Sequence, residues 1–136
     1  MIKLTLPTLW QTDDFGLLFL RISSALLVLY VHGLPKLFHW QTELQHIDDP
    51  LHFGTTLTLL CALFAEIVCP LFIFLGLWTR LACLPLLFLL LVSMLLVHAD
   101  WSIEQGQFGW LLMIVFTTIA VSGPGKFTVK IFSIER

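Results

Sequence analysis

Four long apolar runs, interrupted by few polar side chains, make up most of the chain. They cover residues 15–34, 54–78 and 81–99, and a fourth, starting near Gln105, covers 105–122. A helix that crosses the hydrocarbon core of a bilayer needs about 20 mostly apolar residues. The runs also lack the alternation of apolar and polar residues that marks a membrane β-barrel strand. The pattern predicts an all-α integral membrane protein, in which residues 1–136 form a single four-transmembrane-helix bundle.

The composition supports a membrane protein over a water-soluble one. Hydrophobic residues make up 58% of the chain and charged residues 12%, whereas soluble domains average about 25% charged residues. A soluble domain of this composition would expose large apolar patches. A cleaved signal peptide is not expected, because the first apolar run is too long and contains Arg21.

Charges between the apolar runs predict the orientation in the membrane. Four spans place both termini and the connection after the second span on one side. That side carries most of the cations: Lys3, Arg80, Lys126, Lys130 and Arg136. The opposite side, residues 35–53 and 100–107, carries only Lys36. Because cytoplasmic segments are enriched in Lys and Arg, the distribution predicts that both termini are cytoplasmic.

Glu66 is the most unusual residue of the predicted spans. It lies 12 residues from each end of 54–78, about 18 Å from either end and near the bilayer midplane. A charge at that depth costs at least ~2.5 kcal/mol, so it should face the bundle interior and have a partner. Pro70 has no N–H to offer the Glu66 carbonyl. We expect Arg21 to be the partner, because it lies about 9 Å away along the membrane normal and its guanidinium suits a buried carboxylate.

This expected pair has two interpretations that the sequence leaves open. It could only fix the register of the helices, a role that buried polar groups sometimes have. It could also handle a ligand, since charged residues inside membranes often mark functional sites.

Other polar residues fall on the same faces of the predicted helices. On an ideal helix Arg21 and His32 lie about 20° apart, with Lys36 one turn beyond. Arg80 and His98 are separated by five full turns of the third helix. We therefore expect a common polar interior, with the candidate catalytic residues Glu66, His98 and His32 and the candidate ligand-binding or orienting residues Arg21, Lys36 and Arg80. The alternatives are that the histidines are interfacial and that Arg80 is a topology anchor.

Metal and thiol chemistry are not expected. No two histidines have the H-x-x-x-H or H-x-x-H spacing of ligands on one helix, and no C-x-x-C occurs. The three cysteines fall within or beside the predicted spans, and they suit small, buried apolar positions.

Several segments together resemble a known family. They are LRISSALLVLYVHGLPKLF, FAEIVCPLFIFLGLWTRLACLPL, VHAD and GPGKFTVKIF. In this order and spacing they resemble the DoxX family of small four-helix inner-membrane proteins, over residues 15–132. The most specific elements are an arginine in the first span, H-G-x-x-K, A-E, G-L-x-T-R, His98 at the end of the third span and the G-P-G-K tail. The resemblance implies a bacterial inner-membrane protein; relatives include the membrane subunit of a thiosulfate:quinone oxidoreductase.

Three functional hypotheses follow. In the first, the chain is the membrane subunit of a quinone-linked oxidoreductase system: Glu66, His98 and His32 supply protons, and Arg21 and Lys36 orient a non-covalently bound quinone. The sequence has no redox motif of its own, so electrons would come from a partner protein. The second hypothesis is a non-catalytic anchor or assembly scaffold that presents residues 35–53 to an enzyme. The third is a small lipid or solute carrier, which would require a homo-oligomer. No nucleic-acid partner is expected.

Overall fold

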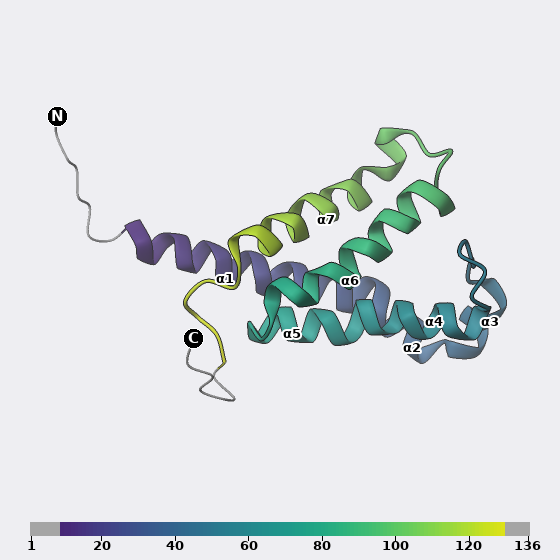
Figure 1. The fold of residues 1–136 in the computed structure, drawn as a ribbon, viewed down its shortest axis with the longest axis horizontal. Coiled ribbons are helices and arrows are strands. Elements are labelled where there is room, and N and C mark those ends of the chain that lie inside the picture. The colour runs from purple at the N-terminus through teal and green to yellow at the C-terminus, as the bar shows by residue number, and fades with distance from the viewer. Residues whose placement is uncertain (1–8, 130–136) are drawn as a thin grey trace.

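A computed structural model describes residues 9–129, and the side chains from residue 13 onward (Figure 1). Lys3, Lys130 and Arg136, which contributed to the predicted orientation, lie outside the described residues. Within these, four helical stretches are long and apolar enough to cross a membrane: Asp13–Phe38, Thr55–Leu75, Thr79–Val97 and Ile103–Ser122. No strand occurs between residues 9 and 129. The prediction of an all-α membrane protein with four spanning helices is confirmed.

The first three spanning stretches are each built from α-helix and one π-helical turn, and a short helix follows the first. In chain order the elements are α1 (Leu9–Val28), η1 (Leu29–Gly33), α2 (Leu34–Phe38), α3 (Trp40–His46), α4 (Thr55–Leu63), η2 (Phe64–Val68), α5 (Cys69–Leu75), α6 (Thr79–Val92), η3 (Ser93–Val97) and α7 (Ile103–Ser122).

The first span is longer than predicted. Residues 35–38 were expected in a loop, but they form α2 and continue the helix to Phe38. Pro35 does not end the helix, because it occupies the first turn of α2, where a backbone N–H is not required. Lys36 therefore belongs to a spanning helix and not to an extramembrane loop.

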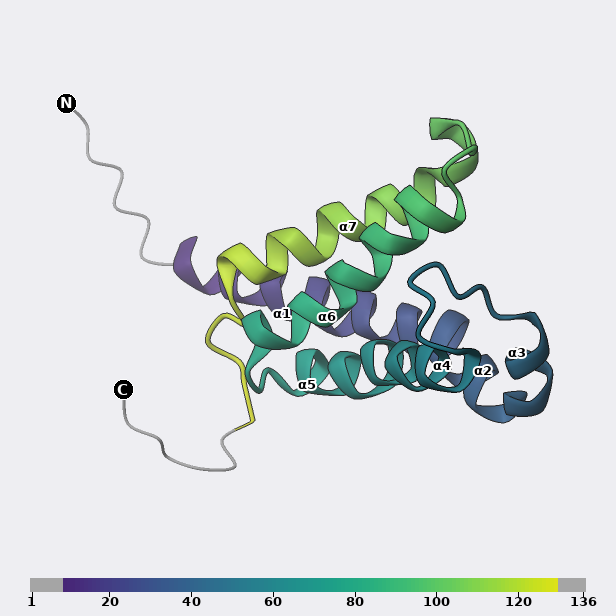
Figure 2. The same cartoon turned by 45° about the vertical axis from the view of Figure 1, so that its right-hand side comes forward.

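The described chain begins and ends at the same end of the bundle. The start of α1, the turn between α5 and α6, and the tail after α7 lie together there, while α3 and the α6–α7 connection lie at the opposite end (Figure 1). Toward that opposite end, α6 and α7 diverge from α4 in both views (Figures 1 and 2).

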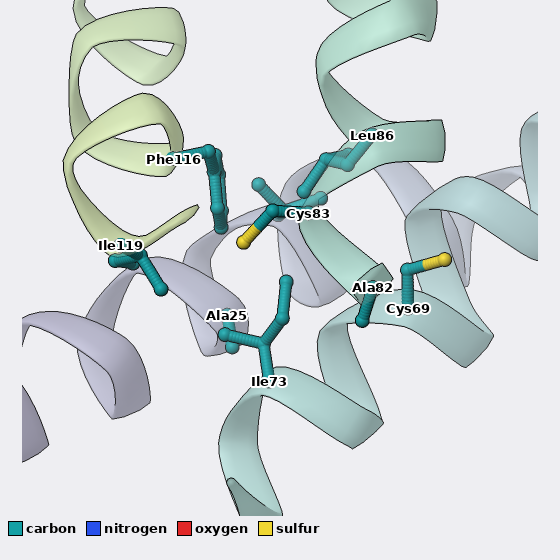
Figure 3. Close-up of a cluster of buried hydrophobic side chains, with 9 residues drawn as sticks. Ala25, Cys69, Ile73, Ala82, Cys83, Leu86, Phe116 and Ile119 are labelled. Carbon is teal, nitrogen blue, oxygen red and sulfur yellow. The ribbon is translucent and has the colours of Figure 1, made fainter. Parts of the chain in front are cut away.

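All four spanning helices contribute to the hydrophobic core. Its buried side chains are Ala25, Val28, Cys69, Ile73, Ala82, Cys83, Leu86, Phe116 and Ile119, and Figure 3 shows them converging from α1, α5, α6 and α7. Small residues such as alanine let membrane helices approach closely. Cys69 and Cys83 are buried here as expected, whereas Cys61 is exposed.

The three π turns change which residues share a helix face. Each π turn adds about one residue to a helical turn, so the side chains that follow are rotated by about 100° relative to an uninterrupted α-helix. The predicted polar faces assumed uninterrupted helices. Such turns are frequent at functional sites, and here η1 contains His32, η2 contains Glu66 and η3 ends immediately before His98.

Candidate functional site

Glu66 pairs with Lys36 inside the bundle. Its side chain is buried, with 5% of the residue exposed, and the Lys36 ammonium donates a hydrogen bond to Oε1 at 3.1 Å. The same ammonium lies 2.8 Å from Oε2. This second contact is an ion pair, and the buried Oε2 accepts no hydrogen bond from the described residues.

Close contact between η1 and η2 brings the pair together. A Cβ at Gly33 would collide with the Glu66 carbonyl oxygen and lie only 2.8 Å from the Ile67 side chain. Only glycine therefore lets the two π turns cross at this distance. Lys36, three residues beyond Gly33, then reaches the Glu66 carboxylate.

The predicted pair between Arg21 and Glu66 is wrong. Arg21 is buried, with 2% exposed, but it donates hydrogen bonds to the backbone carbonyls of Pro124 and Phe127, the latter at 2.6 Å. A longer contact of 3.4 Å reaches the Phe74 carbonyl. The tail after α7 folds back across α1 and α5, and two of its carbonyls accept hydrogen bonds from the guanidinium that we expected to pair with a carboxylate.

Further contacts hold this tail in place. The Lys126 N–H donates to Asp14 Oδ1 at 3.0 Å, and the Val129 N–H donates to the Leu75 carbonyl at 3.0 Å. The Phe15 and Phe127 rings lie 4.9 Å apart. Residues 124–129, which include most of the G-P-G-K motif, thus form a closure between α1 and the end of α5.

A cavity of about 670 Å³ adjoins the ion pair. Its walls come from α2, α3, the loop before α4, α4, η2, α6 and η3, so it lies where α6 diverges from α4 (Figure 2). Three of the predicted site residues line it: Lys36, Glu66 and His98. Lining residues that the sequence did not predict include Glu43, His46 and Asp48. These residues lie in α3 and in the loop that follows it. No periodic pattern in the sequence indicated them, because their position at the cavity depends on how α3 packs against α4.

The other predicted site residues lie elsewhere. His32 is half-buried in η1 and does not line the cavity. Arg80 is exposed at the start of α6, at the opposite end of that helix from His98. Its guanidinium lies beside the tail, 3.1 Å from where a Cβ on Gly123 would be. The expected stripe from Arg80 to His98 is therefore not one site.

His98 lies at the end of the third span. Its ring stacks on Trp101, with centroids 3.8 Å apart. Besides the large cavity, it lines a second one of about 290 Å³ together with Met94 and Trp110. No group of three or more His, Cys, Asp or Glu side chains within residues 13–129 is placed to hold a metal ion.

Asp49 shapes the loop over the cavity. Its carboxylate accepts hydrogen bonds from the Thr58 hydroxyl at 2.8 Å and from the backbone N–H groups of Phe53 and Gly54 at 3.0 and 2.9 Å. The pKa of Asp49 lies below its ordinary value, chiefly because of the Thr58 hydrogen bond and further because of the two backbone hydrogen bonds. Asp49 thereby ties residues 49–54 to the first turns of α4.

Comparison with known proteins gives one match. The DoxX family model matches residues 16–99, a range that includes every residue lining the large cavity. No curated protein and no solved structure matches the chain significantly. Since the matched range is more than half of the chain and agrees with the segments that carry the resemblance, the chain belongs to the DoxX family of multi-pass membrane proteins.

Proposed function

We propose that the chain is the membrane subunit of a quinone-linked oxidoreductase system and that the large cavity binds the quinone head group. The observation that carries the proposal is the ion pair of Lys36 with the buried Glu66, in the wall of a cavity of about 670 Å³ among the spanning helices. Ligand sites are typically 300–1,000 Å³, mostly apolar, and contain a few well-placed polar groups.

The polar residues suit the oxygens of a quinone head. A quinone takes up two electrons and two protons, so that its two carbonyl oxygens become hydroxyls. The Lys36 ammonium has three donors and uses one on Glu66 Oε1, so it retains donors for a carbonyl oxygen. Glu66 Oε2 accepts no hydrogen bond from any described residue. A small shift of the Lys36 side chain would let this oxygen accept a hydrogen bond from a hydroxyl of the reduced quinone.

Proton movement is assigned to residues of the same cavity. Glu66 holds or releases a proton at its carboxylate beside the head group, while Lys36 stabilises negative charge there. His98 lines the cavity near the end that carries α3, and an imidazole can accept and return a proton. Glu43, His46 and Asp48 line the same region, so they would connect the cavity with water.

The predicted orientation of the chain determines toward which side of the membrane the cavity lies. With both termini in the cytoplasm of a bacterium and the chain in the inner membrane, α3 and the cavity mouth face away from the cytoplasm. The partner that supplies electrons would then dock on residues 39–54, the longest described segment outside the spanning helices.

Co-purification tests the proposal. Protein is solubilised gently, and extracted small molecules are quantified by mass spectrometry for the wild type, Lys36→Met, Glu66→Gln and the lipid-facing control Leu111→Ala. We expect about one quinone per chain in the wild type and the control, and a large loss in the other two. A scaffold would yield only bulk phospholipid together with a reproducible protein partner. A carrier would yield a different stoichiometric ligand, and either result would refute the quinone assignment.

A further inference from the structure

The large cavity reaches the outer surface of the bundle between two spanning helices. Leu60 and Phe64, at the end of α4 and the start of η2, and Phe88 on α6 all line it. The same three side chains are 50%, 51% and 58% exposed. A residue that lines a cavity and is also half exposed marks an opening of that cavity.

This opening lies at the depth of the hydrocarbon core. Phe64 is nine residues from the start of the span Thr55–Leu75, and Phe88 is nine residues from the end of Thr79–Val97. At 1.5 Å per residue both lie about 14 Å from the same end of the bundle, deep inside a hydrocarbon layer about 30 Å thick. Lipid chains, and not water, therefore surround the opening.

The arrangement of α6 explains why an opening exists. Both views show α6 diverging from α4 toward the end that carries α3 (Figures 1 and 2). Pro85 also lines the cavity and lies inside α6, where it removes one helical hydrogen bond and favours a bend. The side chains of α4 and α6 consequently leave the cavity beside the Lys36–Glu66 pair open between the two helices.

We infer that the cavity is loaded sideways from the bilayer through this opening, the lateral window of Leu60, Phe64 and Phe88. Its occupant is a lipid-soluble molecule with an oxygen-bearing head beside Lys36 and Glu66 and an apolar tail that leaves between α4 and α6. The inference rests on the proposed function in using the same cavity, but it does not require quinone chemistry.

The end of the cavity beside α3 suits a different role. It is lined by Glu43, His46 and Asp48, and an apolar tail that passed between them would desolvate carboxylates at a cost of free energy. Protons and water pass such side chains without that cost. The cavity thus separates an apolar route for the ligand from a polar route for protons.

Association rates test the window. The probe is a quinone with a ten-carbon tail, added to vesicles that contain the wild type, Leu60→Trp or Leu57→Trp. Leu57 is 50% exposed on the same helix but does not line the cavity, so it is the matched control. A narrowed window should slow association and dissociation alike, by about fivefold, because a constriction on the route raises the barrier in both directions. Equal rates for all three proteins, or equally tight binding of the same head without a tail, would overturn the inference.

Native Cys61 separates failure of the window from failure of the quinone assignment. It lines the cavity and is the exposed one of the three cysteines, so a spin label reacts there selectively. A label at Cys61 should collide more often with dissolved oxygen than with a water-soluble nickel chelate. A label at the lipid-facing Leu111→Cys should behave in the same way, whereas a label at Gln45→Cys should meet the nickel chelate more often. A label that meets the nickel chelate more often would refute the window, whatever ligand the protein binds. A lipid-accessible label without quinone binding would refute only the quinone.

Discussion

Lys36 and Glu66 lie thirty positions apart in the chain, and their side chains form an ion pair with Nζ 2.8 Å from Oε2. The pair exists because Gly33 lets η1 cross η2 in close contact. Burial of one charge without its partner in a membrane interior is costly, so the pair stabilises the crossing as well as providing polar groups for a ligand.

A double-mutant cycle should reveal the pair. Removal of one partner from a buried ion pair typically costs 3–5 kcal/mol. Because the Lys36 side chain is 22% exposed, we expect about 2 kcal/mol of destabilisation for Lys36→Met or Glu66→Gln alone, with solvent screening accounting for the reduction. The double variant should lose less than the sum of the two. Reversible unfolding in detergent micelles measures all three.

The same cycle with Arg21 provides the control. Arg21 hydrogen-bonds to tail carbonyls and not to Glu66, so the losses caused by Arg21→Ala and Glu66→Gln should add within about 0.5 kcal/mol. Strong coupling between Arg21 and Glu66, combined with additivity between Lys36 and Glu66, would contradict the observed pairing.

Gly33→Ala should separate the two π turns. The added methyl group would collide with the Glu66 carbonyl, and overpacking of this kind costs about 1–3 kcal/mol. Gly16→Ala is the matched control on the same span, because nothing lies within 4 Å of the position that a Cβ would take there. Alanine at this position should stabilise the helix by up to about 1 kcal/mol. Thermal unfolding of both variants checks the difference in sign. Equal effects would show that Gly33 is not a contact point.

Arg21→Ala should release the tail. Without the guanidinium the carbonyls of Pro124 and Phe127 lose their donor, so hydrogen exchange at the Lys126 and Val129 amides should accelerate at least tenfold, the factor that corresponds to about 1.4 kcal/mol. Ser23→Ala is the control, since its hydroxyl bonds only within α1. Unchanged protection at both amides in Arg21→Ala would rule out the closure.

Asp49 predicts a pH dependence of the loop over the cavity. Its pKa is lowered, chiefly by the Thr58 hydroxyl, so the folded state favours the carboxylate. The resulting stability is complete above the ordinary aspartate pKa of about 3.9 and is lost as the pH falls through the lowered value. Thr58→Val should raise the pKa of Asp49 in a carbon-13 NMR titration, whereas Asp48→Asn should not. An unshifted titration in Thr58→Val would contradict the assigned cause.

The sequence predicted the number and character of the spanning helices, because solvation in a bilayer imposes a clear length and composition on each one. It also predicted that Glu66 lies inside the bundle and needs a donor. Both conclusions rest on the cost of burying charge, which depends little on the details of packing.

The partner of Glu66 could not be predicted in the same way. We chose Arg21 for its axial distance from Glu66 and for its guanidinium, and neither property shows which side chains face each other across the bundle. The π turn in η1 alters the helix face, and the helix continues through Pro35, which brings Lys36 into the span. The carbonyls that bind Arg21 come from a tail more than a hundred residues away. No local pattern signals that the tail folds back.

Photolabelling with an azidoquinone tests whether the cavity beside Lys36 and Glu66 binds a quinone. The protein in vesicles is labelled, digested and mapped by mass spectrometry, with an excess of unmodified quinone as competitor. If it does, label that the competitor displaces should appear in the cavity walls, in residues 36–48, 60–66 and 85–98, and it should be lost in Glu66→Gln. Label spread over the lipid-facing side of α7, or label that the competitor does not displace, would show that the cavity beside Lys36 and Glu66 is not a quinone site.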